Sequence, residues 1–80
     1  MNRSISTIAR EIEAEWSKQG KGVNFAARPY LNAMKHLGSV QDYFFEDDAK
    51  TVVLYFLSNA SSYRGPVAKA HKAELKAMIK

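Results

Sequence analysis

The chain has 80 residues, with 12 lysines and arginines against 8 aspartates and glutamates, which gives a formal net charge of +4. This length allows one small domain, and the absence of cysteine excludes disulfide bonds, thiolate nucleophiles and zinc sites built with cysteine. The longest apolar run, Val52 to Leu57, is far shorter than the roughly 20 residues of a membrane helix, and the N-terminus has no signal-peptide pattern. We therefore expect a cytoplasmic protein that does not associate with membranes.

A first helix is predicted over about residues 4–19. Its apolar residues recur three and four positions apart and therefore share one face: Ile5, Ile8, Ile12 and Trp16. Ser4 suits the N-cap position, because its hydroxyl can accept a hydrogen bond from the first turn. Gly20 and Gly22 favour an end to the helix.

A second, shorter helix is predicted over residues 29–37. Pro29 suits its first position, and proline disfavours the helical conformation at the preceding Arg28. One face of this helix is apolar and consists of Tyr30, Leu31, Met34 and Leu37. Gly38 follows as a stop.

The segment 51–57 is ambiguous, because its β-branched and aromatic residues would also suit a buried strand. A longer window favours a helix, since the apolar residues recur with helical spacing: Ala49, Val52, Val53, Phe56, Leu57 and Ala60. Asp47 or Asp48 can cap its N-terminus. No other stretch alternates with period two to supply a partner strand. We therefore predict a third helix, at the centre of the fold.

A fourth helix is predicted from Pro66 to the C-terminus, after a small and polar loop over residues 59–65. Its expected apolar side consists of Val67, His71, Leu75 and Met78. Together the four segments predict an all-α, compact three- to four-helix domain that spans residues 1–80. The predicted core consists of Ile8, Ile12, Trp16, Leu31, Met34, Val53, Phe56, Leu57 and Leu75.

The last helix also carries a basic stripe, which is the strongest functional signal in the chain. Its members follow helical spacing, with one arginine just before the helix: Arg64, Lys69, Lys72, Lys76 and Lys80. Clustered cations can neutralise phosphates, so the stripe favours binding to nucleic acid or to an acidic surface of a protein or nucleoprotein. Tyr63, beside Arg64, is the one aromatic side chain next to these charges that could stack on a base. An ordinary solvated helix face is the simpler interpretation of the same stripe.

Aromatic residues suggest a different class of function. The chain has more of them in its second half than a small domain easily buries: Tyr43, Phe44, Phe45, Tyr55 and Tyr63. Exposed apolar patches often mark interfaces. The alternative hypothesis is therefore a homodimeric interaction module, in which the lysine stripe only keeps the protein in solution.

Catalytic and metal-binding patterns are not found in the sequence. It contains no nucleophile elbow and no glycine-rich phosphate loop. His36 and His71 have no second ligand at metal spacing, so each is interpreted as a boundary residue of its helix. The acidic run 46–48 lacks the alternating ligands and the glycine of a calcium loop. We therefore predict a protein that is not an enzyme and has no cofactor or metal.

Five blocks form a pattern over most of the chain: 12–16 (IEAEW), 27–34 (ARPYLNAM), 49–60 (AKTVVLYFLSNA), 64–65 (RG) and 72–76 (KAELK). The pattern resembles a group of small, mostly uncharacterised proteins of phages and other bacterial mobile elements. Similar proteins have Trp-Arg-Gly where this chain has Tyr63-Arg64-Gly65, and Tyr-Gly-x-Asp-Ser where it has residues 44–48. The resemblance implies a mobile-element origin and an accessory or anti-defence role, and it transfers no activity or site residue.

Overall fold

A computed structural model describes residues 3–38, 43–44 and 47–79. The predicted all-α fold is confirmed. The described chain contains the helices α1 (Ile5–Trp16), α2 (Arg28–Met34), α3 (Ala49–Ser58) and α4 (Pro66–Met78). Between α2 and α3, the short strands β1 (Tyr43–Phe44) and β2 (Asp47–Asp48) pair antiparallel, with Tyr43 opposite Asp48. The sequence did not indicate this two-residue ladder.

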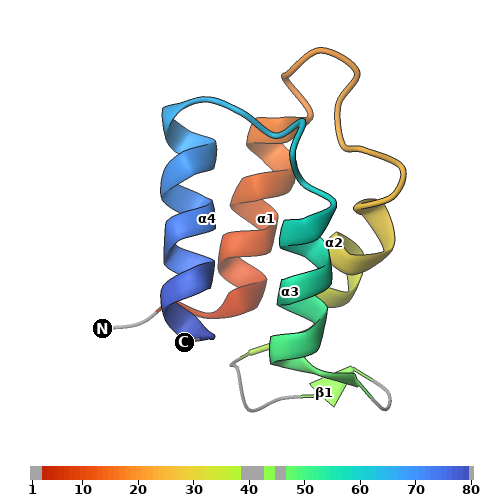
Figure 1. The fold of residues 1–80 in the computed structure, drawn as a ribbon, viewed down its shortest axis with the longest axis vertical. Helices are drawn as coiled ribbons and strands as arrows, with labels where there is room; N and C mark the ends of the chain where they lie inside the picture. The colour runs from red at the N-terminus through yellow and green to blue at the C-terminus, as the bar shows by residue number, and fades with distance from the viewer. Residues whose placement is uncertain (1–2, 39–42, 45–46, 80) are drawn as a thin grey trace.

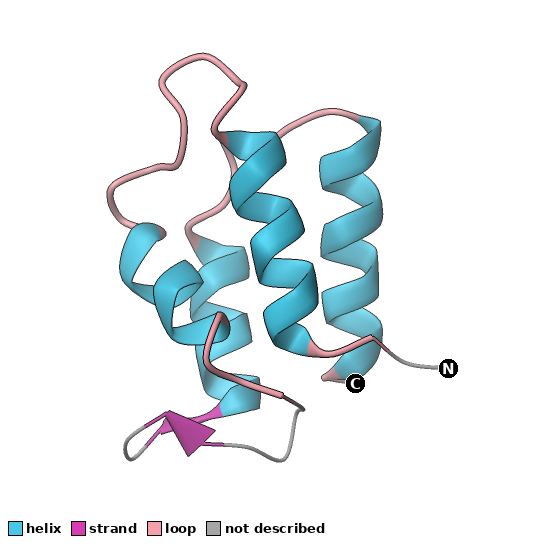
Figure 2. Cartoon of the chain, turned by 180° about the vertical axis from the view of Figure 1, so that it is seen from behind, coloured by secondary structure: helices cyan, strands magenta, loops and turns pink. Residues whose placement is uncertain are grey.

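The helix α1 occupies the middle of the domain (Figure 1). It packs antiparallel to α4 on one side and against α2 on the other, and α2 in turn packs against α3. The view from behind shows the same order (Figure 2). The prediction that residues 49–60 form the central helix is therefore wrong. The helix α1, whose buried face includes Ala9 beside the isoleucines, contacts both α2 and α4, whereas α3 packs mainly against α2.

The predicted helix starts agree closely with the structure, whereas α1 ends at Trp16 and α2 at Met34, each three residues before its predicted end. The Ser4 hydroxyl accepts a hydrogen bond from the N–H of Thr7 at 3.1 Å, and the Asp48 carboxylate accepts one from the N–H of Thr51 at 2.8 Å. Thr51 therefore lies in the first turn of a helix rather than in a strand. The helix α2 begins at Arg28, one residue earlier than predicted, because a turn closed by the Asn24 carbonyl already leads into it.

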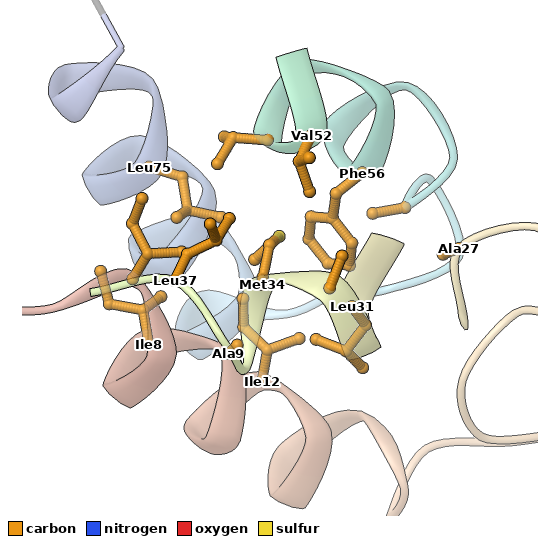
Figure 3. Packing of buried hydrophobic residues seen from close by; sticks show 14 of the residues in the cluster. Ile8, Ala9, Ile12, Ala27, Leu31, Met34, Leu37, Val52, Phe56 and Leu75 are labelled. Carbon is orange, nitrogen blue, oxygen red and sulfur yellow. The ribbon is translucent and has the colours of Figure 1, made fainter. Parts of the chain in front are cut away.

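One hydrophobic cluster joins all four helices (Figure 3). Every predicted core residue is buried except Leu57, which is partly buried against the cluster. Val67 is 45% exposed, contrary to prediction. Ala68 takes its place, because Ala68, His71 and Leu75 lie at i, i+3 and i+7 and together face α1.

Trp16 is the anchor of the core at the end of α1. Its ring stacks on Tyr63 with centroids 5.2 Å apart and meets Phe56 edge to face at 6.1 Å. These contacts attach the loop between α3 and α4 to the core. They also explain how the residues before α4 are held in a fixed position.

Candidate functional site

Four of the five predicted cations lie around one open groove on α4. The groove has a volume of about 570 Å³ and is lined by Tyr63, Arg64, Gly65, Ala68, Lys69, Lys72, Ala73 and Lys76. Lys80, the fifth, lies outside the described residues. The helical spacing of the lysines therefore does bring them to one surface, as the sequence predicted.

The groove is cationic and has no acidic residue in its lining. None of its four cations forms an ion pair with a carboxylate in the described part of the chain. Elsewhere three glutamates do form ion pairs, for example Glu13 with Arg28 and Lys35 at 2.6 and 3.0 Å. The charges of these four residues are therefore not paired with a carboxylate in the part of the chain that the structure describes, which suits an anionic partner.

The N-terminus of α4 adds to this positive surface. Gly65 occupies the N-cap with φ of 106°, a left-handed conformation that side chains rarely adopt. No side chain caps the helix, and its first turn holds no acidic residue. The positive end of the helix dipole is therefore left without an acidic partner beside Arg64.

Lys72 has a structural contact as well as a place in the groove. Its ammonium group donates a hydrogen bond to the carbonyl oxygen of Tyr63 at 2.7 Å and lies 5.9 Å from the centre of that ring. Burial lowers the pKa of Lys72, and the nearby charges of Lys76 and Arg64 lower it further. Lys69 and Lys76 are exposed, so these two lysines and Arg64 are the most accessible cations.

A chain of hydrogen bonds runs from Tyr63, in the lining of the groove, through the buried His71 to the exposed Glu11. The hydroxyl of Tyr63 lies 2.6 Å from Nδ1 of His71, and Nε2 of His71 lies 3.1 Å from a carboxylate oxygen of Glu11. Because a carboxylate only accepts, His71 donates through Nε2. In the neutral imidazole, Nδ1 then accepts from the hydroxyl of Tyr63. The structure corrects one prediction here and refines another. Tyr63 is fully buried rather than exposed for stacking. His71 lies on the apolar side of α4 as predicted, but at 6% exposed it belongs to the interior and not to the boundary of the helix.

Arg3 extends this chain to the N-terminal segment. Its guanidinium donates two hydrogen bonds to the carboxylate of Glu74, at 3.0 and 2.7 Å, and one to Glu11. These bonds lower the pKa of both glutamates, with His71 adding to the effect on Glu11. The result is that α1 and α4 are fixed to each other by charged groups along their contact.

A second hollow, of about 630 Å³, lies next to the groove where the loop after α1 meets the loop before α4. Both loops lie at the end of the domain opposite the termini (Figure 1). The Gln19 side-chain amide joins them, since it donates to the carbonyl of Arg64 at 2.6 Å and accepts from the N–H of Arg64 at 3.1 Å. Lys21, Phe25 and Arg64 contribute to the lining, so Arg64 borders both hollows.

Phe25 is the functional candidate that sequence reasoning missed. Its side chain is 93% exposed, the highest value among the large apolar residues that the structure describes. The signal that could have revealed it is its place outside every apolar periodicity, in the loop between Gly22 and Pro29. An exposed aromatic ring that shares a hollow with two cations therefore does exist, but it is Phe25 and not Tyr63.

The structure describes only some of the side chains of the predicted aromatic interface. Tyr63 is excluded from it by burial. Tyr43 and Phe44 form β1, where the structure describes no side chains, and Phe45 lies outside the described residues. Tyr55 is 51% exposed on α3, next to Leu54 at 53%.

The described parts of the chain hold neither a cluster of metal ligands nor a helix that could span a membrane. Residues 3–38, 43–44 and 47–79 contain no cluster of three or more histidine, aspartate or glutamate side chains that could hold a metal ion. Within the same ranges no helix has the length and apolar character needed to cross a membrane. Neither His36 nor His71 lines either of the two hollows.

Comparisons of the chain with protein-family models, with curated proteins and with solved structures give no match. Function is therefore inferred from the residues and their geometry.

Proposed function

We propose that this chain is a small, non-enzymatic cytoplasmic protein that binds the phosphate backbone of nucleic acid along the groove of α4. The observation that carries the proposal is the clustering of four cations, without a counter-charge among the described residues, around a groove whose lining contains no acid. Small residues on the groove floor, Gly65, Ala68 and Ala73, leave room for a strand to approach the helix.

The spacing of the cations suits a polyphosphate. Lys69 and Lys76 are seven residues apart on α4, which corresponds to about 10 Å along a helix. In a duplex, each strand carries a phosphate about every 3.4 Å of helix axis, so this length covers about three phosphates. Arg64 extends the cationic surface beyond the N-terminus of the helix.

The resemblance to small proteins of phages and other mobile elements is consistent with this proposal. A nucleic-acid binder of this size could serve as an accessory or anti-defence protein that acts on a nucleic acid or nucleoprotein of the host. The competing partner for the same groove is an acidic protein surface. Nucleic acid and an acidic protein both supply negative charge, but only nucleic acid supplies phosphates and bases.

The experiment that tests the proposal is fluorescence anisotropy with short labelled single-stranded and duplex DNA and RNA, at low and near-physiological salt. Polyglutamate is the probe for an acidic protein partner. We expect binding to nucleic acid that weakens steeply with salt, because bound phosphates release counterions. Binding to polyglutamate without binding to nucleic acid would overturn the proposal.

Two charge-reversal variants make the test specific to the groove. Lys69→Glu/Lys76→Glu reverses two groove cations, and Lys18→Glu/Lys50→Glu reverses two exposed lysines that line neither hollow. Both variants change the net charge equally. The proposal predicts loss of binding in the first variant only, with unchanged helical circular dichroism in both. Equal losses would mean that net charge rather than the groove attracts the nucleic acid.

A homodimer is a second candidate, favoured by the exposed apolar residues on α3. Leu54 and Tyr55 are each about half exposed, and the ring of Tyr55 lies 5.5 Å from that of Tyr30 on α2. Sedimentation at high micromolar concentration tests this candidate. A monomer there would exclude it, and a dimer lost in Leu54→Glu would support it.

A further inference from the structure

We propose that the protein prefers single-stranded nucleic acid, because Phe25 offers a stacking surface for an unpaired base next to the cationic groove. This inference rests on the proposed function and names its substrate class. It depends on the way the two loops at one end of the domain bring Phe25, Lys21 and Arg64 to a single hollow.

Phe25 is available for stacking in a way that the other aromatic residues are not. Its side chain is 93% exposed, while the rings of Trp16 and Tyr63 are packed against each other in the core. An exposed phenylalanine removes almost no apolar surface from water, so Phe25 contributes little to the stability of the fold. Every base has a flat apolar face, and stacking on an aromatic ring is a general means of binding single strands.

The hollow and the groove share Arg64 in their linings. This residue lines both spaces, and its backbone is fixed by two hydrogen bonds with the Gln19 side chain. A strand whose phosphates follow Lys76, Lys69 and Arg64 would therefore reach Phe25 at its end. Lys21 supplies a further cation at that end.

Duplex nucleic acid does not fit this arrangement equally well. Its bases are already stacked and paired, so no base face is presented to Phe25 unless the duplex opens. Its phosphates can still bind the lysines of α4. The groove alone would thus bind both forms, and Phe25 would add affinity only for the single strand.

The test compares three probes: a single strand, its duplex with the complementary strand, and an abasic strand that has as many phosphates as the single strand but lacks the bases. For the single strand, Phe25→Ala should reduce affinity about 5- to 150-fold, the range for loss of one stacked base. For the duplex and the abasic strand the change should be less than about twofold. Phe25 is exposed, so its replacement should leave the helical circular dichroism unchanged.

Two further variants separate stacking from simple apolar contact. Phe25→Leu keeps the apolar character and should behave like Phe25→Ala, whereas Phe25→Trp should bind the single strand at least as well as the unmodified chain. The introduced indole should also be quenched by the single strand and not by the abasic strand.

The possible results distinguish this inference from the function on which it rests. If the unmodified chain binds nucleic acid and Phe25→Ala binds the single strand equally well, stacking is overturned and the groove proposal stands. Equal weakening for all three probes would overturn stacking too, because it would show that Phe25 acts on the groove itself. Absence of binding to every probe by the unmodified chain would overturn both proposals.

Discussion

The hydroxyl of Tyr63, in the lining of the cationic groove, lies 2.6 Å from Nδ1 of His71, and both side chains are buried. The bond joins the loop before α4 to the helix itself, eight residues further along the chain. Lys72 reinforces the same connection through the carbonyl of Tyr63. Arg64 lies just before α4 in the lining of the groove, and its position therefore depends on the burial of the neighbouring Tyr63.

Replacement of the buried hydroxyl should destabilise the protein. Tyr63→Phe leaves Nδ1 of His71 buried without its donor, which should lower the free energy of unfolding by about 1–3 kcal/mol. Urea unfolding followed by circular dichroism measures this change. Tyr55→Phe is the matched control, since Tyr55 is half exposed, and its effect should stay within about 0.5 kcal/mol. Equal effects of the two variants would contradict the structural role of the Tyr63–His71 bond.

Lys72 and Lys69 should differ in their effect on stability although both line the groove. Lys72→Met keeps the aliphatic stem and removes the hydrogen bond to Tyr63, so the free energy of unfolding should fall by about 1 kcal/mol. Lys69→Met should change it by less than about 0.5 kcal/mol, because Lys69 is exposed. Both variants should weaken nucleic-acid binding. Equal stability of the two variants in urea would argue against a structural role for Lys72.

Acid should destabilise the fold through its paired glutamates. The pKa of Glu13 is lowered by hydrogen bonds from Lys35 and Arg28, and those of Glu11 and Glu74 are lowered by hydrogen bonds from Arg3. Because folding lowers these pKa values, the ionised glutamates add to the free energy of unfolding at any pH above 4.5, the ordinary pKa of a glutamate. This contribution is lost as the pH falls through the pKa values of the glutamates in the folded protein. The free energy of unfolding should therefore decline as the pH drops below about 5.

Glu13→Gln tests this explanation at one site. The variant should be less stable at neutral pH by about 0.5–1 kcal/mol and should lose less stability on acidification. Glu15→Gln on the same helix is the control, because Glu15 has no ion pair in the described part of the chain. A Glu13→Gln variant with the same acid sensitivity as the unmodified chain would refute the assignment.

Much of the fold could be predicted because its helices have regular apolar spacing. Residues such as Ile8, Ile12 and Phe56 recur with helical periods, and Ser4 and Asp48 mark helix starts by their chemistry alone. The lysines of α4 were predictable for the same reason, since spacing along one helix fixes which side chains share a face.

The remainder of the site depends on contacts between distant parts of the chain. The sequence alone suggests that His71 is a boundary residue, because its contact with Glu11 joins positions that are 60 residues apart. The sequence alone suggests that Tyr63 is exposed, because its stacking on Trp16 in the core cannot be inferred from spacing. Phe25 follows no period at all, and only the meeting of two loops puts it next to Arg64.

The most direct test of the central claim is the salt dependence of single-strand affinity, measured as the slope of log K against log salt concentration. Contacts from Arg64, Lys69, Lys72 and Lys76 to four phosphates predict a slope of about −3, at about 0.7 per phosphate. Lys69→Gln/Lys76→Gln should reduce its magnitude by about 1.4. A slope near zero, or one that this double variant leaves unchanged, would contradict the claim that the groove of α4 binds phosphates.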